Sequence, residues 1–361
     1  MPCMTTKTAI VVGAGIIGAC LAYRLARAGL HVTIVDAGQA HNGASGGSWA
    51  WLNAVSAGDK SYFDLRQASL AAYHDLEKEL SGRLKIDWTG ALIWDPGLYS
   101  PKVVNAPQKN WGGNVKTVTA DEIRALEPLL TSPPDGALFS ADDGLVDGAY
   151  ATRTLIEAAQ SIGARCAFGR RVKSMIHEND RITGVQTDFG ALYADVTVLA
   201  AGTGISDLLA EHAIPLPTAN RAGLLITTAP VTKRMTRALW SDTVHVKQLS
   251  DDRLVIGEND HAPGALDNPE ATITQMIETT QKLLPALGML SVERTTIATR
   301  PIPGDGFPVI GAIPSLHGAY IAMMHSGFTL AAITAKLLSQ EILNNEESPL
   351  LAPYRLSRFA Q

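Results

Sequence analysis

The sequence predicts a mixed α/β (α+β overall) fold: a Rossmann-like domain with a parallel sheet, and an inserted second domain of mainly antiparallel β-sheet. Residues 7–37 have the order strand, glycine-rich turn, helix, strand. Residues 215–300 are rich in strand patterns, and residues 319–343 return to a buried strand followed by a helix. We expect residues 1–86, 142–218 and 301–361 to form the Rossmann-like domain, and residues 87–141 and 219–300 to form the inserted substrate domain.

The N-terminal segment has the parts of a dinucleotide-binding unit. Its glycines, Gly13, Gly15 and Gly18, follow a buried strand and open a helix. The first glycine permits the tight turn, the second lets the backbone approach a pyrophosphate, and the third lets the helix pack closely on the strand. The helix N-terminus favours phosphate, and Asp36 at the end of the second strand can accept hydrogen bonds from a ribose. These parts together predict a bound dinucleotide, the alternative being a glycine-rich turn without a ligand.

Hydrophobic spacing and turn residues predict the remaining elements. Helix patterns cover 16–28, 61–80, 150–162, 269–284 and 329–343. Strand patterns cover 9–12, 31–35, 84–94, 115–118, 171–176, 182–188, 196–200, 223–228, 243–248, 253–257, 292–299 and 319–324. We expect turns at 177–181 and 189–191, a Pro/Gly loop at 300–311, and a capping box from Thr119 to Glu122 that opens a short helix.

Composition excludes several classes of protein. The chain of 361 residues is 46% hydrophobic and 18% charged, which suits a large core, and its net charge of -5 gives no reason to expect nucleic acid. Three scattered cysteines (Cys3, Cys20 and Cys166) argue against a disulfide framework, and the histidines lack metal-ligand spacing. Only six residues precede Lys7, and the apolar stretch 319–338 is interrupted by polar residues. We therefore expect a cytoplasmic protein with no metal and no integral membrane segment.

Two further stretches bring small residues to the predicted ligand. Residues 41–54, directly after the second strand, are dense in Gly, Ser and Ala, and residues 198–204 read Val-Leu-Ala-Ala-Gly-Thr-Gly at a strand end. Bare backbone in both places would fit against the same dinucleotide. The alternative for residues 41–54 is an ordinary mobile loop, and Trp49 and Trp51 within it are expected in the core or a pocket wall.

With these motifs and the pattern R-P-x-P-x-D-G-x-P-x-I-G from Arg300 to Gly311, the chain resembles the flavoprotein amine oxidoreductases that include D-amino acid oxidase, glycine oxidase and sarcosine oxidase. The resemblance spans nearly the whole length, and residues 253–257 (Arg-Leu-Val-Ile-Gly) point to the glycine oxidase branch. It implies a non-covalent FAD in the Rossmann-like domain. The residues implied to hold it are Gly13, Gly15, Ile16, Ile17, Gly18, Asp36, Ala37, Ala44, Ser45, Gly46, Gly47, Ser48, Val172, Ala201, Gly202, Arg300, Ser326, Gly327, Phe328 and Thr329.

Arg300, His325 and His245 are the candidate catalytic residues, and the resemblance implies a substrate contact for Arg300. Arg300 would pair with a substrate carboxylate, since a guanidinium grips a carboxylate through two parallel hydrogen bonds. The alternative is a structural arginine that pairs with an acid at the domain interface, such as Asp305. His325 opens the loop along the pyrimidine edge of the flavin, or is a satisfied core group. His245 stands where glycine oxidase-like proteins carry a tyrosine, and either contacts substrate or is a half-buried strand residue. Val255 stands where sarcosine oxidase-like enzymes place an oxygen-activating lysine, so O₂ is not implied as acceptor.

The resulting hypothesis is an enzyme that oxidises the C–N bond of a small amino acid or secondary amine (glycine, sarcosine, a proline-like or a D-amino acid). The product would be an imine, formed by hydride transfer to flavin N5. Two alternatives stay open: a flavin-carrying subunit of a multi-chain amine or opine dehydrogenase, and a nicotinamide-dependent dehydrogenase. The expected partner is a small molecule, with a homo-oligomer or a partner subunit compatible with this hypothesis.

Overall fold

The computed structural model describes residues 7–55, 57–95, 110–258 and 266–360. Its first sheet has six strands in the order β18-β19-β12-β1-β2-β8, parallel except for β18. The strands are β1 (Thr8–Val12), β2 (His31–Val35), β8 (Arg165–Ala167), β12 (Val196–Leu199), β18 (Val309–Ala312) and β19 (Ala319–Met323). This sheet confirms the predicted Rossmann-like fold.

Both faces of the parallel sheet are covered, because successive side chains of a strand point to opposite faces and both sets are apolar here. Ala9 and Val11 of β1 pack toward the helices, while Ile10 and Val12 pack on the opposite face. On the helical face, α1 (Ile16–Arg27) packs against α5 (Gly148–Ser161) and α8 (Gly327–Asn344), and α8 packs against α2 (Lys60–Glu79). The opposite face is covered by α6 (Ile205–Ala210) and the antiparallel strands β9 (Val172–Glu178), β10 (Arg181–Thr187) and β11 (Gly190–Tyr193).

The second large sheet has eight strands in the order β17-β13-β16-β15-β14-β4-β6-β5, antiparallel except for the pair β14 and β4. Its strands are β4 (Ala91–Ile93), β5 (Val115–Thr119), β6 (Gly136–Ser140), β13 (Arg221–Thr228), β14 (Ala238–Trp240), β15 (Val244–Gln248), β16 (Leu254–Glu258) and β17 (Val292–Arg300). Helices α4 (Ala120–Leu126) and α7 (Pro269–Leu283) accompany it, and β3 (Trp51–Leu52) pairs with β7 (Gly144–Leu145). All eight strands come from the two segments predicted as the inserted domain, and we keep that division as a proposal.

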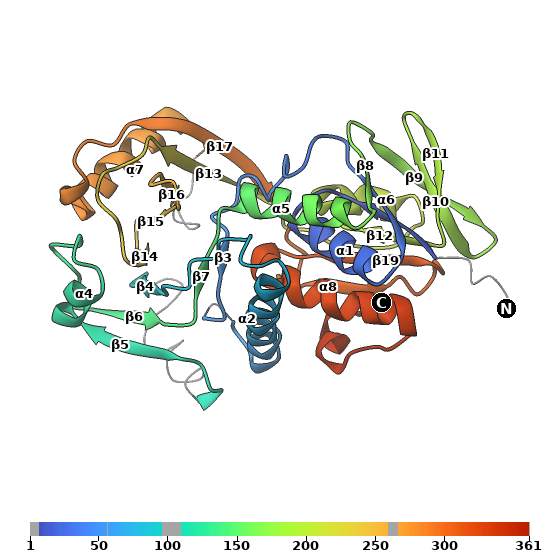
Figure 1. Cartoon of the computed structure of the whole chain (residues 1–361), viewed down its shortest axis with the longest axis horizontal. Helices are drawn as coiled ribbons and strands as arrows, with labels where there is room; N and C mark the ends of the chain where they lie inside the picture. The colour runs from blue at the N-terminus through green and yellow to red at the C-terminus, as the bar shows by residue number, and fades with distance from the viewer. Residues whose placement is uncertain (1–6, 56, 96–109, 259–265, 361) are drawn as a thin grey trace.

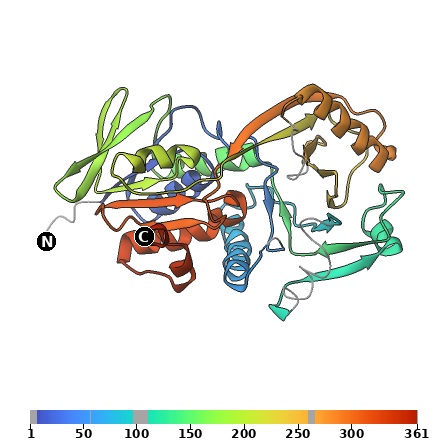
Figure 2. The same ribbon diagram turned by 180° about the vertical axis from the view of Figure 1, so that it is seen from behind.

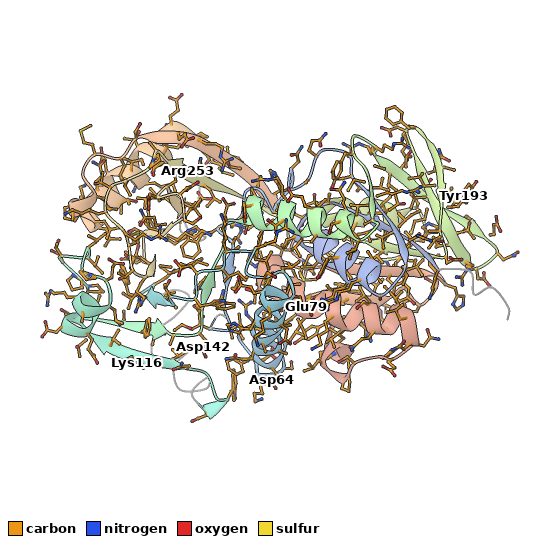
Figure 3. The ribbon with its side chains drawn as sticks, in the orientation of Figure 1. Asp64, Glu79, Lys116, Asp142, Tyr193 and Arg253 are labelled. Atoms are coloured by element: carbon orange, nitrogen blue, oxygen red, sulfur yellow. The ribbon has the colours of Figure 1, made fainter. Side chains whose placement is uncertain are left out.

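The two large sheets lie at opposite ends of the molecule (Figures 1 and 2). Helix α2 stands between them, and β17 runs from the eight-stranded sheet toward the parallel sheet. Exposed side chains mark the periphery, such as Tyr193 on the outer edge of β11 and Lys116 on β5 (Figure 3). The end of β17 therefore brings the eight-stranded sheet close to the parallel sheet.

Several local predictions are confirmed. The capping box is present, with the Thr119 hydroxyl accepting from the backbone of Glu122 and the Glu122 carboxylate accepting from the backbone of Thr119. Predicted core residues of α2, such as Phe63, Leu70 and Tyr73, are each buried to within 4% exposure. Within the residues that the structure describes, no helix is both long and apolar enough to cross a membrane.

Other local predictions are wrong. Residues 84–94 form a strand only at Ala91–Ile93, because Lys85 and Gly90 take positive φ values of 54° and 78°. The turn expected at 189–191 begins β11, and the loop expected at 300–311 contains the start of β18. In β18, Val309 and Ile310 are fully buried against β19, a pairing that its four residues do not reveal in sequence.

Candidate active site

A cavity of about 1120 Å³ runs along the end of the parallel sheet to the eight-stranded sheet. One end is lined by Gly13, Gly15 and Asp36, and the other by His245 and Arg300. Pockets for drug-sized ligands usually measure about 300–1,000 Å³, so this one has room for a dinucleotide together with a small second molecule.

The phosphate end of the cavity is a backbone cradle. Gly13 has φ 110°, and a Cβ there would overlap the carbonyl of Ala200, where the ends of β1 and β12 meet. Gly15 is the N-cap of α1, and a Cβ on it would come within 2.9 Å of Ser45 Oγ. Ser45 Oγ accepts a hydrogen bond from the Ile16 amide at 2.9 Å, which leaves its own O–H to donate to a ligand. The residues present therefore fit a diphosphate above the N-terminus of α1.

Asp36 is held rigidly at the end of β2. Its two carboxylate oxygens accept from the amides of Ala14 and Gly38, each at 2.7 Å. Each oxygen keeps a lone pair for a ribose hydroxyl. The backbone of Arg170 donates to the Asp36 carbonyl at 2.9 Å, which places Arg170 beside the same end of the cavity. Arg170, Arg171 and Lys173 line this end and were not among the predicted residues.

The structure brings together most residues predicted to hold the cofactor. Those that line the cavity are Gly13, Gly15, Ile16, Ile17, Asp36, Ala37, Ala44, Ser45, Gly47, Ser48, Val172, Ala201, Gly202, Arg300, Ser326, Gly327, Phe328 and Thr329. Gly18 does not line it; a Cβ there would overlap the carbonyl of Gly13, so it serves the close helix–strand packing expected of it. Gly46 also lies outside the cavity, because it is turned toward the backbone of His41.

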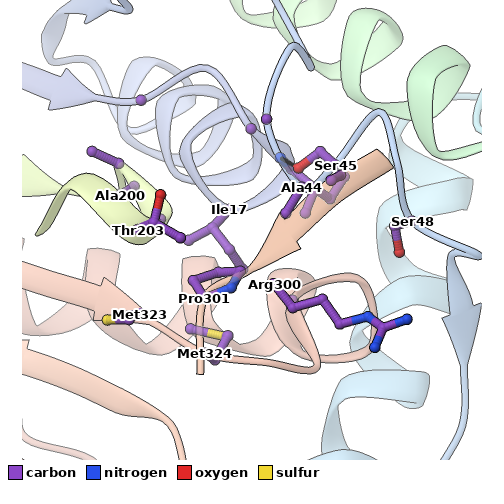
Figure 4. Close-up of a pocket in the computed structure, with 18 of the residues that line it drawn as sticks. Ile17, Ala44, Ser45, Ser48, Ala200, Thr203, Arg300, Pro301, Met323 and Met324 are labelled. Atoms are coloured by element: carbon purple, nitrogen blue, oxygen red, sulfur yellow. Dashed lines mark hydrogen bonds between the residues drawn. The ribbon is translucent and has the colours of Figure 1, made fainter. Parts of the chain in front are cut away.

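Arg300 ends β17 at the junction of the two sheets. Its side chain extends to the side of the cavity where Ser48 lies, away from Ala200 (Figure 4). It packs directly on Gly223 of the neighbouring strand β13, where a Cβ would overlap the guanidinium. Asp305, the alternative partner considered from the sequence, forms a 2.6 Å ion pair with Arg358 instead. Asp305 is therefore not the acid that pairs with Arg300.

His245 belongs to an aromatic wall, which we define as Trp49, Trp51, Trp240 and His245. The imidazole stacks on Trp240 with ring centroids 4.2 Å apart and an angle of 6°, and it meets Trp49 edge-on at 5.0 Å. Trp51 in turn stacks on Trp240, with ring centroids 4.9 Å apart. All four line the cavity, and His245 is 3% exposed rather than half-buried.

The indole N–H groups hold this wall in place. Trp49 Nε1 donates to the carbonyl of Val255 at 3.1 Å, and Trp51 Nε1 donates to Asp143 Oδ2 at 2.8 Å. Burial raises the pKa of Asp143 to about 8, although its hydrogen bonds from Ser140 and Trp51 act in the opposite direction. The rings thus present carbon surface to the cavity, as predicted for Trp49 and Trp51. Trp240 was missed because β14 has only three residues and no visible period.

His325 lies on the loop between β19 and α8. It lines the cavity and is exposed, so the alternative of a core histidine is wrong. Its carbonyl accepts from the Gly327 amide at 2.9 Å, which turns the chain into α8. A Cβ on Gly327 would lie 3.8 Å from Ile16 and Ile17, so the N-termini of α8 and α1 face the same space.

Arg66 is the main residue that sequence reasoning missed. It lines the cavity from α2, yet it is only 2% exposed. A signal was present: Phe63, Arg66, Leu70 and Tyr73 follow one another at helical spacing, so a charged residue falls on the apolar face of a predicted amphipathic helix.

Comparison with known proteins identifies the family. Residues 8–341 match the family model DAO, FAD dependent oxidoreductase. The chain is 29% identical over 363 residues to the bifunctional protein ThiO/ThiG of Synechocystis sp., covering 98% of this chain but only 54% of that relative. It is 28% identical over 348 residues to glycine oxidase of Bacillus licheniformis, covering 93% of each. The crystal structure of glycine oxidase from Bacillus cereus superposes with a TM-score of 0.84 at 23% identity, covering 99% of this chain and 100% of that one.

The family match overturns the nicotinamide alternative and agrees with the glycine-lined cradle, the second glycine-rich strand end and the volume of the cavity. The chain belongs to the DAO family of FAD-dependent oxidoreductases, flavoenzymes that oxidise C–N bonds of amino acids or amines, and its cofactor is FAD.

Proposed function

We propose that this enzyme oxidises the Cα–N bond of a small amino acid or secondary amine to an imine, which water then hydrolyses. The observation that carries the proposal is the position of Arg300. Its guanidinium lies in the same cavity as the dinucleotide cradle, at the end next to the aromatic wall. A cation at that position selects substrates that carry a carboxylate.

The residues of the chain orient the substrate rather than exchange protons with it. Arg300 holds the carboxylate through parallel hydrogen bonds and thereby fixes Cα, while His245 and the tryptophans keep water from that side. Bound FAD supplies the hydride acceptor at N5. The substrate reacts as the neutral amine, whose lone pair assists departure of the hydride from Cα.

The first test is anaerobic reduction of the purified yellow holoprotein by a panel of glycine, sarcosine, proline and D-amino acids. Bleaching of the flavin bands by at least one α-amino carboxylate, and by none of the matching amines without a carboxylate, supports the proposal. Bleaching by amines that lack a carboxylate contradicts the role of Arg300.

The second test is Arg300→Ala compared with Arg300→Lys, using the best substrate of the panel. Loss of a charge-assisted bidentate contact worth ~2–3 kcal/mol should raise KM by on the order of 10²-fold in the alanine variant. The lysine variant keeps the charge and loses the paired geometry, so it should fall between alanine and wild type. An unchanged KM in Arg300→Ala rejects the assignment.

The alternative of a flavin-carrying subunit leads to a different result in the same assay. A subunit that depends on another chain would be yellow, would not bleach with any member of the panel, and would co-purify with that chain from its native source. Position 255 is a valine and not the lysine of sarcosine oxidase-like enzymes. A comparison of O₂ with a dye as oxidant identifies the electron acceptor of the reduced flavin.

A further inference from the structure

Arg66 is a buried cation whose hydrogen bonds are made to neutral groups. Its Nε and Nη2 donate to the backbone and side-chain oxygens of Asn53 at 2.9 and 2.8 Å. Its Nη1 donates to the Tyr62 hydroxyl at 3.2 Å and to Ser326 Oγ at 2.9 Å. Four of the five guanidinium N–H groups are therefore directed at uncharged oxygens.

The charge of Arg66 has no counter-ion in the part of the chain that the structure describes. No Asp or Glu oxygen among those residues lies within ion-pair distance of its guanidinium. Burial raises the pKa of the Asp143 carboxyl to about 8 and so favours its neutral form. The Arg66 charge acts in the opposite direction and has a smaller effect on that pKa. A buried cation without an anion is costly unless a ligand supplies the missing negative charge.

The N-terminus of α8 is a second source of positive potential, next to Arg66. Ser326, which accepts from Arg66, is the N-cap of α8 and makes no capping hydrogen bond with its own side chain. The helix continues for 18 residues behind it, so its N-terminal dipole and the guanidinium act on the same part of the cavity. No acidic residue lies in the first turn of α8 to oppose them.

We propose that Arg66 is the electrostatic partner of the bound flavin ring, stabilising the negative charge that the ring gains on reduction. The proposal rests on the family's cofactor and on the ring lying at the N-terminus of α8, and it does not depend on which substrate is oxidised. With a diphosphate held over the N-terminus of α1, the ring would extend toward α8, because the N-termini of the two helices face the same space. Arg66 and the first turn of α8 would then hold the ring, and Arg66 would act on the flavin potential rather than on the substrate.

The test is the two-electron reduction potential of the holoprotein in Arg66→Met and Arg66→Lys, with Tyr62→Phe as control. In Arg66→Met the equilibrium constant for reduction should fall at least tenfold, which is about 30 mV toward negative potential for a two-electron couple. Tyr62→Phe removes one neutral acceptor and leaves the charge, so its potential should stay at the wild-type value.

Arg66→Lys keeps the proposal testable where the methionine variant does not fold. A lysine buried at this position should have a lowered pKa. Flavin reduction takes up protons, so both potentials fall as the pH rises, and the potential of the lysine variant should fall more steeply than that of wild type around the lysine pKa. An unchanged potential in Arg66→Met with full FAD content overturns the proposal. So does a raised KM at unchanged potential, which would make Arg66 a substrate ligand. If no amino acid of the panel reduces the flavin, these potentials are unaffected. That result contradicts the proposed function and not the role of Arg66.

Discussion

The imidazole of His245 lies directly over Gly257 of the neighbouring strand, and a Cβ at position 257 would overlap its ring. The two residues are cross-strand partners between β15 and β16. The side of the cavity formed by the aromatic wall therefore depends on a residue that has no side chain.

Replacing Gly257 with Ala should displace His245 and disturb its stacking on Trp240. We expect a loss of stability of ~1–3 kcal/mol from overpacking, and a higher KM with FAD content unchanged, because position 257 does not line the dinucleotide cradle. Steady-state kinetics and thermal unfolding check both parts. Gly58→Ala, at an exposed glycine where an added methyl group would meet no atom within 4 Å, should change neither.

Replacing Asp36 with Asn should weaken FAD binding. An amide has one acceptor oxygen where the carboxylate uses two, so its NH₂ group would face the amide of Ala14 or Gly38. Charge-assisted hydrogen bonds worth ~1.5–3 kcal/mol correspond to an increase in Kd of on the order of 10- to 100-fold. Titration of the apoprotein of each variant with FAD measures this Kd.

The matched control for Asp36 is Asp195→Asn. Asp195 likewise accepts from backbone and hydroxyl of Thr8 at 2.8 and 2.7 Å, but at the other end of β1, away from the cavity. It should lower stability and leave the FAD dissociation constant unchanged. Equal losses of FAD affinity in the two variants would contradict a specific role for Asp36.

The stability of wild type should fall as the pH rises from about 5 to 7, relative to Asp143→Asn. Burial raises the folded-state pKa of Asp143 from 3.8 to about 8, so the folded chain binds more protons in this window than the unfolded chain. One proton gives a slope of up to about 1.4 kcal/mol per pH unit. The window stops at 7 because burial lowers the pKa of Lys247 to about 7, and that group contributes the opposite slope above it.

Chemical denaturation at several pH values measures this slope. In Asp143→Asn the Ser140 hydroxyl can accept where it now donates, so the site keeps its hydrogen bonds. Asp142→Asn, at the exposed neighbouring position, serves as control and should retain the wild-type slope. Parallel curves for wild type and Asp143→Asn would show that the carboxyl does not titrate in this window.

FAD should be released intact when the protein is denatured. Cys20 and Cys166 do not line the cavity, so neither thiol is placed to bond the flavin; Cys3 lies outside the described residues. After acid precipitation we expect the yellow colour in the supernatant and no fluorescent band with the chain in a denaturing gel. A coloured pellet would identify a covalent link and direct attention to His325 and His245, the histidines of the cavity.

Sequence reasoning succeeded where the physical signal is local. The order strand, glycine turn, helix and strand is read within 31 residues, and the two glycine-rich strand ends at Gly13 and Gly202 meet because parallel strands end at one edge. Short strands without a period, such as β14 and β18, were missed because their burial comes from partners distant in sequence.

The sequence by itself determined the Rossmann-like fold and the cradle for a dinucleotide, since both depend on residue types at fixed short spacing. The resemblance to a known family added FAD as that dinucleotide and Arg300 as a candidate for carboxylate binding. Only the tertiary structure decided that Asp305 pairs with Arg358, that Trp240 joins His245 in a wall, and that Arg66 of α2 reaches Ser326 at the N-cap of α8. These contacts join segments up to 260 residues apart. Their energies depend on burial and on which charges lie nearby in space, neither of which is encoded by any one stretch of the chain.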